Sequence, residues 1–457
     1  MSSFKEFGLS SAMVANLEQL GFEQPTEIQA KALPHCLAGK DVIAMAQTGS
    51  GKTAAFGIGL IEGLRPRLFA VQAVVLCPTR ELADQVAKSL RELARARKNI
   101  KVLTLCGGVA IGPQIGSLSH GAHIVVGTPG RVQDHLRKGT LKLDKANTVV
   151  LDEADRMLDM GFQEAMEDIL SHTPDTRQTL MFSATWPEPI RKLSARYQRE
   201  PVDVRAESSG ANPDIRELFY EIPAGSTADA VMAVLSERQP ASCIVFCTTK
   251  QQCDELADSL RDSGFSALAL HGDLEQRDRD SVLVRFGNQS CSVLVATDVA
   301  ARGLDIKSLP LVINAEPARD PEVHTHRVGR TGRAGEQGLA VTLCTPAKGH
   351  KINQLEAARQ RPVEWGDTEA LLAVPLRPVA PAMRTLCIAG GRKDKVRPGD
   401  VLGALTGEAG IPGKAVGKID LFDFQCFVAI DREFAAKALK RLEQGRIKGR
   451  KIRVRYA

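Results

Sequence analysis

The sequence has few aromatic residues other than phenylalanine, with only 2 Trp and 3 Tyr among its 457 residues. Aromatic stacking sites must therefore be few. No apolar run is long enough to cross a bilayer, and the first residues, Met1–Glu6, lack the pattern of a signal peptide. We therefore expect a cytoplasmic protein without a membrane partner, and the length suggests about three domains.

Paired cysteines are also missing. The ten cysteines stand singly among apolar neighbours, as in Val75-Leu76-Cys77 and Val245-Phe246-Cys247. No Cys-x-x-Cys pair supports a zinc site. Scattered cysteines of this kind are typical of reduced, buried thiols in a protein of the cytosol.

The net charge of +6 is unevenly placed along the chain. Residues 383–457 hold 17 Lys and Arg against 8 Asp and Glu, a net charge of +9, so the remainder carries about −3. A basic module on a mildly acidic body indicates an acidic polymer as partner, most simply a nucleic acid.

One stretch has the spacing of a phosphate-binding loop. The residues Ala46-Gln47-Thr48-Gly49-Ser50-Gly51-Lys52-Thr53 follow a predicted strand over 41–45 and open a predicted helix. Backbone N–H groups of such a loop close around phosphate oxygens, and the helix N-terminus adds a favourable dipole. Lys52 can reach the outer phosphates, and the Thr53 hydroxyl can ligate magnesium.

An acidic cluster follows a second buried strand. The β-branched run 148–151 ends in Asp152, Glu153 and Asp155. Three carboxylates at the end of a buried strand cost free energy unless a cation neutralises their charge. The usual cation at such a place is magnesium, bound together with a phosphate ester. Alone, this cluster is equally well explained as a solvated helix start. With the phosphate loop it predicts a nucleotide site.

Polar turns follow three more predicted strands. They hold Pro78-Thr79-Arg80, Gly107-Gly108 and Thr128-Pro129-Gly130-Arg131. In open parallel sheets ligands lie at the carboxyl ends of strands, and these residue types suit a sugar-phosphate backbone. Each turn taken singly favours plain turn chemistry, but three at one sheet edge favour binding. Ser183 and Thr185 could hydrogen-bond the acidic cluster and couple the nucleotide to a second ligand.

The pattern of the first half returns in the second half. Residues 242–250 mirror 73–80, and residues 292–298 mirror 123–128, which indicates a degenerate duplication of one α/β unit. The second copy has no Gly-Lys-Thr loop but holds Arg327, Arg330 and Arg333 within seven residues. Three arginines among glycines are not core material. They are either a solvated loop or, as we predict, arginine fingers that act on the nucleotide of the first domain.

These patterns divide the chain into two tandem parallel-sheet domains and a small α+β tail. Polar or proline-rich stretches supply the predicted linkers. The predicted segments are a first domain over 1–206, a linker over 207–214, a second domain over 215–361, a linker over 362–382, and the tail over 383–457. Within the tail, the pattern predicts a helix over 432–442 and a last strand over 451–455, in which basic and apolar residues alternate.

Taken together, the motifs resemble the DEAD-box RNA helicases. The resemblance covers about residues 4 to 350, and Ala46 is the usual first residue of the phosphate loop in this family. It implies two RecA-like domains that close around ATP and single-stranded RNA. It rests on Phe4, Gly21 to Gln29, the phosphate loop, Asp152-Glu153-Ala154-Asp155, Ser183-Ala184-Thr185 and the run His326 to Arg333.

The resemblance also implies the site residues of an RNA-stimulated ATPase that uses ATP and Mg²⁺. Those implied in catalysis are Lys52, Asp152, Glu153, Arg330 and Arg333, with Glu153 as the base that deprotonates water. Those implied in ATP binding are Phe22, Gln29, Ala46, Gln47, Thr48, Gly49, Ser50, Gly51, Lys52, Thr53 and Asp305, with Thr53 and Asp152 as metal ligands. Ser183 and Thr185 couple ATP to RNA. The RNA-binding set is Pro78, Thr79, Arg80, Gly108, Thr128, Gly130, Arg131 and Thr297 on the core, with Lys448, Arg450 and Lys451 in the tail.

The tail resembles the RRM-like RNA-binding domain of one bacterial subfamily of these helicases. That resemblance implies a hairpin of large-subunit ribosomal RNA and the pre-ribosomal particle as partners, and a role of the monomer in ribosome assembly. Gln425 stands where an aromatic residue would stack on a base, so we expect recognition by loops and basic side chains. Other assignments stay open: a general cold-shock-type DEAD-box helicase, an ATP-dependent RNA clamp, a DNA translocase, or a structural ribosomal RNA binder.

Overall fold

The computed structural model describes residues 3–46, 50–206, 215–301, 309–332, 337–407 and 410–457. The predicted site residues Gln47, Thr48, Gly49, Asp305 and Arg333 lie outside this part of the chain. The described residues form two compact units, one that ends at residue 206 and one that begins at residue 215.

The first unit is built on a seven-stranded parallel sheet with the order β3-β4-β2-β5-β6-β1-β7. Its strands are short, and the central ones are buried along their whole length, as expected for a parallel sheet that helices cover on both faces. The strands are β1 (Val42–Met45), β2 (Ala73–Leu76), β3 (Val102–Leu105), β4 (Ile124–Gly127), β5 (Thr148–Asp152), β6 (Gln178–Ser183) and β7 (Val202–Arg205).

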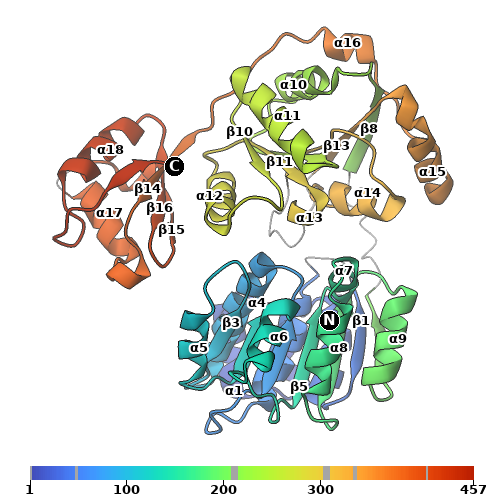
Figure 1. Cartoon of the computed structure of the whole chain (residues 1–457), viewed down its shortest axis with the longest axis vertical. Helices are drawn as coiled ribbons and strands as arrows, with labels where there is room; N and C mark the ends of the chain where they lie inside the picture. Colours follow the sequence, from blue (N-terminus) through green and yellow to red (C-terminus); the bar gives the residue numbers. More distant parts are fainter. Residues whose placement is uncertain (1–2, 47–49, 207–214, 302–308, 333–336, 408–409) are drawn as a thin grey trace. The chain divides into compact units, whose positions relative to one another are not determined.

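Each face of this sheet has its own apolar core, because side chains alternate between the faces along each strand. Helices lie on both faces of the sheet (Figure 1). In β5, Val150 packs on one face and Val149 on the other. The first face is covered by α1 (Ser11–Gln19), α2 (Glu27–Leu37), α3 (Lys52–Gly63) and α4 (Arg80–Leu93), and the second by α6 (Pro129–Arg137), α7 (Ala154–Asp159), α8 (Gln163–Ser171) and α9 (Glu188–Tyr197). Helix α5 (Gly112–Leu118) follows β3.

The second unit begins with a six-stranded parallel sheet with the order β10-β11-β9-β12-β13-β8. The strands are β8 (Ile215–Glu221), β9 (Cys243–Cys247), β10 (Ala267–Leu270), β11 (Val293–Thr297), β12 (Leu311–Asn314) and β13 (Gly338–Cys344). The helices are α10 (Thr227–Arg238), α11 (Lys250–Asp262), α12 (Gln276–Gly287), α13 (Asp298–Ala301), α14 (Pro321–Val328), α15 (Gly349–Arg359) and α16 (Thr368–Leu372).

The two parallel sheets share one strand order. If β8 of the second sheet corresponds to β1 of the first, β9 corresponds to β2, and so on to β13 and β6, then the six strands are arranged identically. The predicted mirror pairs, β2 with β9 and β4 with β11, occupy equivalent positions. The predicted duplication is therefore confirmed.

The segment 362–382 includes ordered structure that covers part of the edge strand β8. Phe219 donates its N–H to the Glu364 carbonyl at 2.9 Å, and its own carbonyl accepts from the N–H of Gly366 at 2.8 Å. Further on, Leu371 of α16 is buried in the core of the second sheet.

The tail folds around an antiparallel four-stranded sheet, with the order β15-β16-β14-β17. Its helices are α17 (Pro398–Thr406) and α18 (Ala435–Gln444), and its strands are β14 (Met383–Ile388), β15 (Val416–Leu421), β16 (Cys426–Asp431) and β17 (Val454–Tyr456). The fold class predicted from the sequence is confirmed.

Two predicted boundaries in the tail are wrong. The helix predicted from Arg432 begins at Ala435, because a turn after β16 uses the Asp431 carboxylate to accept from the N–H of Glu433 at 3.2 Å. The last strand begins at Val454 instead of Lys451, after a tight turn closed by Ile447 and Arg450.

All ten cysteines are free and buried, which confirms the prediction of buried thiols. Burial raises the pKa of the Cys36 and Cys106 thiols to about 12, so neither is a reactive thiolate. Among the described helices, none is long and apolar enough to span a membrane.

Candidate nucleotide and RNA site

The described part of the phosphate loop closes against α2. Gly51 has a left-handed backbone, with φ of +93°, and a Cβ atom there would lie 2.4 Å from Nε2 of Gln29. Glycine is required on both counts. Lys52 is buried at the start of α3, and its Nζ donates to the Ala46 carbonyl at 2.9 Å.

Gln29 lies at the start of α2, beside this loop, and it is buried, with only 2% of the residue exposed. Its Nε2 donates to the Gly51 carbonyl at 3.1 Å, and its Oε1 accepts from the Thr26 N–H at 2.9 Å. A primary amide has a further donor and acceptor for a base. Phe22 is half-buried and packs edge-to-face on Phe4, with ring centroids 6.2 Å apart.

Asp152 ends β5 with its side chain almost fully buried. Burial, opposed by the positive charge of Lys52, raises the pKa of the Asp152 carboxyl to about 7. Its Oδ1 atom is buried and has no hydrogen-bond partner among the described residues. A buried carboxylate oxygen of this kind is the expected arrangement for a cation ligand.

Glu153 directly follows in a left-handed conformation, with φ of +54° and ψ of +51°. This conformation starts α7 and turns the side chain toward Arg156, whose Nη1 lies 2.6 Å from Oε2 of Glu153. Both side chains of the pair are buried. The pairing keeps a buried glutamate compensated next to Asp152.

Asp155 connects the acidic cluster to the end of β6. Its Oδ2 accepts from the backbone N–H groups of Ala184 and Thr185 and from the Thr185 hydroxyl, at 2.9 to 3.1 Å. Its own N–H donates to the Ser183 hydroxyl at 3.4 Å. The predicted hydrogen bonds between these hydroxyls and the cluster are confirmed.

The turns predicted to bind RNA lie at one edge of the first sheet. They follow β2, β3 and β4, which are neighbours in the order β3-β4-β2 and parallel. Thr79 caps α4 by accepting from the Leu82 N–H, and Nη1 of Arg80 is buried without a partner in the described structure. This edge holds Pro78, Thr79, Arg80, Gly108, Thr128, Gly130 and Arg131.

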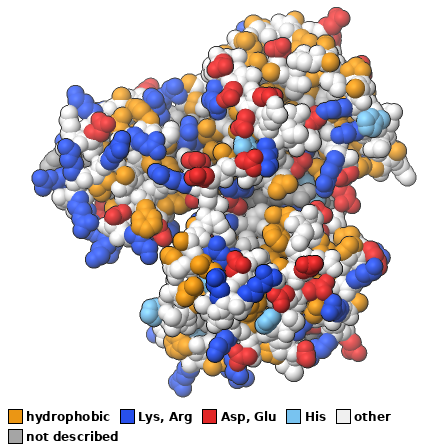
Figure 2. All heavy atoms as spheres, in the orientation of Figure 1, with side chains coloured by type: hydrophobic (Ala, Val, Ile, Leu, Met, Phe, Trp, Pro, Cys, Tyr) orange, Lys and Arg blue, Asp and Glu red, His pale blue; other side chains and the backbone are white. Residues whose placement is uncertain are grey.

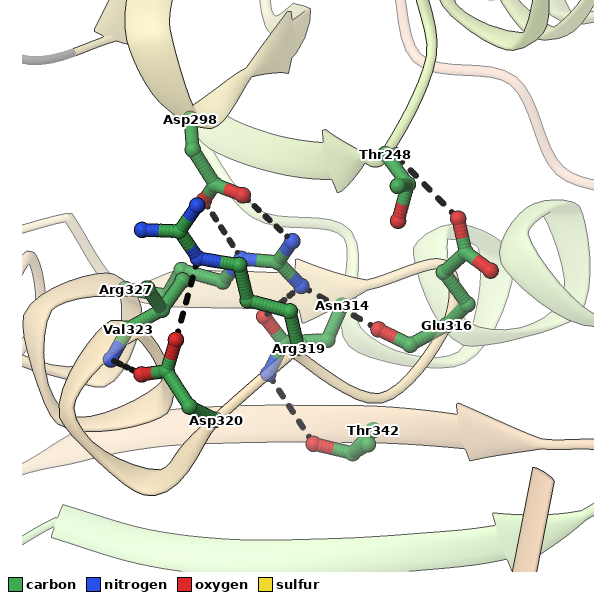
Figure 3. A network of polar contacts seen from close by, with 9 residues as sticks. All are labelled: Thr248, Asp298, Asn314, Glu316, Arg319, Asp320, Val323, Arg327 and Thr342. Carbon is green, nitrogen blue, oxygen red and sulfur yellow. Dashed lines mark hydrogen bonds and ion pairs between the residues drawn. The ribbon is translucent and has the colours of Figure 1, made fainter. Parts of the chain in front are cut away.

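We predicted that none of the three arginines of the second half belongs to the protein core. This prediction is wrong for Arg327. It is 2% exposed, and it makes a two-pronged contact with Asp298 at 2.7 and 2.8 Å (Figure 3). It also donates to Asn314 and to the Glu316 carbonyl, and its guanidinium lies over the Phe246 ring. Arg327 is therefore a structural arginine of the second sheet.

The other predicted residues of the second unit are Arg330 and Thr297. Arg330 is 6% exposed and lies after α14, while Thr297 ends β11 and is buried. In the tail, Arg450 and Lys451 are exposed, and Lys448 donates to the Lys395 carbonyl at 2.8 Å. Lys and Arg side chains are numerous on the visible face of the tail (Figure 2).

Sequence reasoning missed Arg156, Gln114 and His135. Arg156 directly follows the acidic cluster, and its adjacency to buried carboxylates was a usable signal. Gln114 and His135 contact one another between α5 and α6, 21 residues apart, which no local pattern indicates.

Three family models and several relatives match the chain. A DEAD/DEAH box helicase model matches residues 26–193, a Helicase conserved C-terminal domain model matches 226–335, and a DbpA RNA binding domain model matches 385–456. ATP-dependent RNA helicase DbpA of Escherichia coli (strain K12) is 54% identical over 447 residues, covering 98% of this chain and 97% of that protein. DEAD-box ATP-dependent RNA helicase CshA of Geobacillus kaustophilus is 47% identical over 365 residues, covering 80% and 78%.

Solved structures share the fold. Dbp5 of S. cerevisiae bound to RNA and ADP BeF3 has a TM-score of 0.72 at 29% identity, covering 80% of this chain and 96% of that one. Mss116p bound to ssRNA and AMP-PNP has a TM-score of 0.70 at 26% identity, covering 80% of each chain. The chain therefore belongs to the family of DEAD-box ATP-dependent RNA helicases.

Within this family the chain is of the DbpA type, because its third domain matches the DbpA RNA binding domain. It is an RNA-stimulated ATPase and RNA helicase with two RecA-like domains and an antiparallel RNA-binding tail.

The structural role of Arg327 predicts a large loss of stability on substitution. Arg327→Met leaves Asp298 without its partner, and breaking a buried ion pair costs about 3–5 kcal/mol. We expect a loss of this size in the free energy of unfolding of the second unit, measured by urea denaturation. Arg319→Met is the control, since Arg319 pairs with Asp320 at the surface, and we expect a change below about 1 kcal/mol. Equal losses would contradict the assignment.

Proposed function

We propose that the first domain binds ATP through the phosphate loop and the segment around Gln29. Phe22 and Gln29 select adenine, and Thr48 to Thr53 hold the phosphates, with Lys52 on the outer two. The contact of Gln29 with the Gly51 carbonyl supports this role, because it joins the base-reading amide to the phosphate loop. Asp305 contacts the ribose, as the family resemblance implies.

We propose Thr53 and Asp152 as the residues that hold Mg²⁺. The unpartnered, buried Oδ1 of Asp152 fits a divalent cation. Among the described residues, no group of three or more His, Cys, Asp or Glu is arranged to hold a metal. Mg²⁺ typically binds one or two carboxylates together with the phosphates of the substrate. When bound, it neutralises charge on the phosphates.

Hydrolysis then depends on the second carboxylate of the cluster. We propose that Glu153 positions and deprotonates the attacking water, while Arg330 and Arg333 stabilise charge on the transferring phosphoryl group. The position of Glu153 directly after Asp152 in a buried site supports this role. Positioning and electrostatic stabilisation suffice for phosphoryl transfer, so no covalent intermediate is required.

RNA binding is proposed along the three strand ends of the first sheet, with Thr297 contributing from the second. The unpartnered Nη1 of Arg80 supports a phosphate contact there. Asp155, bonded to Thr185 and next to the catalytic glutamate, is the connection through which ATP and RNA favour each other's binding.

The tail is proposed to direct this activity to a hairpin of large-subunit ribosomal RNA, in the pre-ribosomal particle of the cytoplasm, during ribosome assembly. Phe427 of its sheet is only 2% exposed and packs edge-to-face on Phe422, so basic side chains such as Lys448, Arg450 and Lys451 carry recognition. We propose residues 383–457 as the limits of this tail.

A general helicase of the cold-shock type is the second candidate. The DbpA-type assignment is favoured, because the match to DbpA spans 98% of this chain and the match to CshA spans 80%. An ATP-dependent clamp would bind RNA without separating strands, and a strand-displacement assay distinguishes it.

Glu153→Gln tests the catalytic assignment. We expect kcat for ATP to fall at least a hundredfold, since general-base catalysis contributes about 10²–10⁴-fold, while ATP and RNA binding persist. The matched control is Glu167→Gln, because Glu167 pairs with the exposed Arg196 at the same 2.6 Å distance. ATPase activity of Glu153→Gln equal to that of the control would refute the role.

Replacement of Lys448, Arg450 and Lys451 by Gln tests the role of the tail. We expect weaker stimulation of the ATPase by the ribosomal hairpin fragment and unchanged stimulation by bulk RNA, because phosphate contacts of the tail are lost. The control replaces Arg137, Lys142 and Lys145, which are exposed and lie outside the proposed binding edge. An unchanged preference for the hairpin would contradict the assignment.

A further inference from the structure

Gln114 joins the two segments that follow β3 and β4. Its Nε2 donates to the Cys106 carbonyl, at the end of β3, at 2.9 Å. Its Oε1 accepts from Nη1 of Arg131 at 3.1 Å and from Nε2 of His135 at 3.0 Å. Arg131 and His135 both belong to α6, so one side chain connects the loop after β3 with the helix after β4.

The hydrogen bonds of this network are mutually consistent. The Gln114 oxygen can only accept, so His135 donates its Nε2–H, and its Nδ1 lies 2.8 Å from the Thr140 hydroxyl. Burial lowers the pKa of His135, which favours the neutral form of the ring. His135 is fully buried, so the network is part of the interior.

Arg131 forms a second hydrogen bond to the loop that follows β3. Its Nη2 donates to the Val109 carbonyl at 2.9 Å, and only 12% of its side chain is exposed. The segment between Cys106 and Val109, which contains Gly108, is thus bonded at both ends. Gly108 has a φ of +75°, a conformation that favours glycine.

Polar bonds contribute strongly to the position of α5, in addition to the contact of Leu118 with the apolar core of the sheet. None of its residues is fully buried. Besides the bonds of Gln114, the Nζ of Lys101 donates to the Ser117 carbonyl of this helix at 3.0 Å. Loss of the Gln114 amide therefore frees the loop of Gly108 more than it disturbs the core of the sheet.

We propose that Gln114 is a positioning residue for RNA binding, which holds the loop of Gly108 and the start of α6 in the spacing that a sugar-phosphate backbone requires. This inference rests on the proposed RNA-binding role of Gly108 and Arg131. Ordering a loop costs conformational entropy, and a loop that is already fixed avoids this cost when RNA binds.

Gln114→Met tests the inference, because methionine keeps the length of the side chain and removes all three hydrogen bonds. We expect the RNA concentration that gives half-maximal ATPase stimulation to rise about tenfold. The kcat at saturating RNA and the ATP concentration for half-maximal rate stay within about twofold of the wild type. A merely structural role would lower kcat and raise both concentrations.

Gln133→Met is the matched control. Gln133 lies on the same helix, but its Nε2 donates to Asp168 of α8 at 2.7 Å, away from the loop. For this variant, we expect the RNA concentration that gives half-maximal ATPase stimulation to equal that of the wild type. The second variant is His135→Phe, which removes one hydrogen bond of Gln114 and keeps an aromatic ring at this position. We expect its RNA concentration for half-maximal ATPase stimulation to rise about threefold.

The outcomes separate two claims. A wild-type ATPase rate that RNA does not change would overturn the proposed function itself. RNA stimulation of the wild type with an unchanged half-maximal RNA concentration in both Gln114→Met and His135→Phe would overturn the inference alone. A shift in Gln133→Met equal to that in Gln114→Met would also overturn it.

Discussion

Three carboxylates at the carboxyl end of the buried strand β5 must be compensated for the first domain to fold, and each is compensated differently. Asp155 accepts three hydrogen bonds from residues 184 and 185. Glu153 pairs with Arg156. Asp152 keeps a buried oxygen without a partner in the described structure, and this is the oxygen that we propose as a ligand of Mg²⁺. The chemistry of the site follows from this division, because a buried acid is retained where it is used.

The different contacts of these carboxylates place the proposed catalytic base next to the residue that contacts the end of β6. Asp155 and Glu153 are two residues apart, so the bonds of Asp155 to the end of β6 and the position of the proposed catalytic base share one short helix start. A ligand that moves residues 183–185 therefore also changes the position of Glu153, the proposed base. By linkage, the nucleotide must then change the affinity for that ligand equally.

Local patterns were sufficient for most of the fold. The β-branched runs predicted the parallel strands, and the repeat of 73–80 in 242–250 predicted a second copy of the α/β unit. The shared strand order of the two sheets came from the structure. The phosphate loop was recognisable because its glycine spacing is local. Arg327 was misjudged, since its partners Asp298 and Asn314 lie 29 and 13 residues upstream and only the folded sheet brings them together. Gln114 was missed for the same reason.

The boundaries in the tail show a further limit. Helical periodicity placed α18 correctly in outline, but the turn that delays its start depends on the Asp431 carboxylate, which the apolar pattern does not register. The loop carbonyl that accepts from Gln29 likewise lies 22 residues away from it in the sequence. Periodicity therefore predicts elements, while the polar contacts that set their ends and their sites come from tertiary structure.

The most direct test of the account is the coupling between ATP and RNA in Asp155→Asn. The measurement is the affinity for a nonhydrolysable ATP analogue with and without saturating single-stranded RNA, in the wild type and in this variant. Asparagine keeps one acceptor but loses the charge that strengthens three hydrogen bonds. The account predicts that RNA tightens nucleotide binding in the wild type and that most of this effect disappears in the variant. Equal tightening in both would show that Asp155 does not carry the coupling.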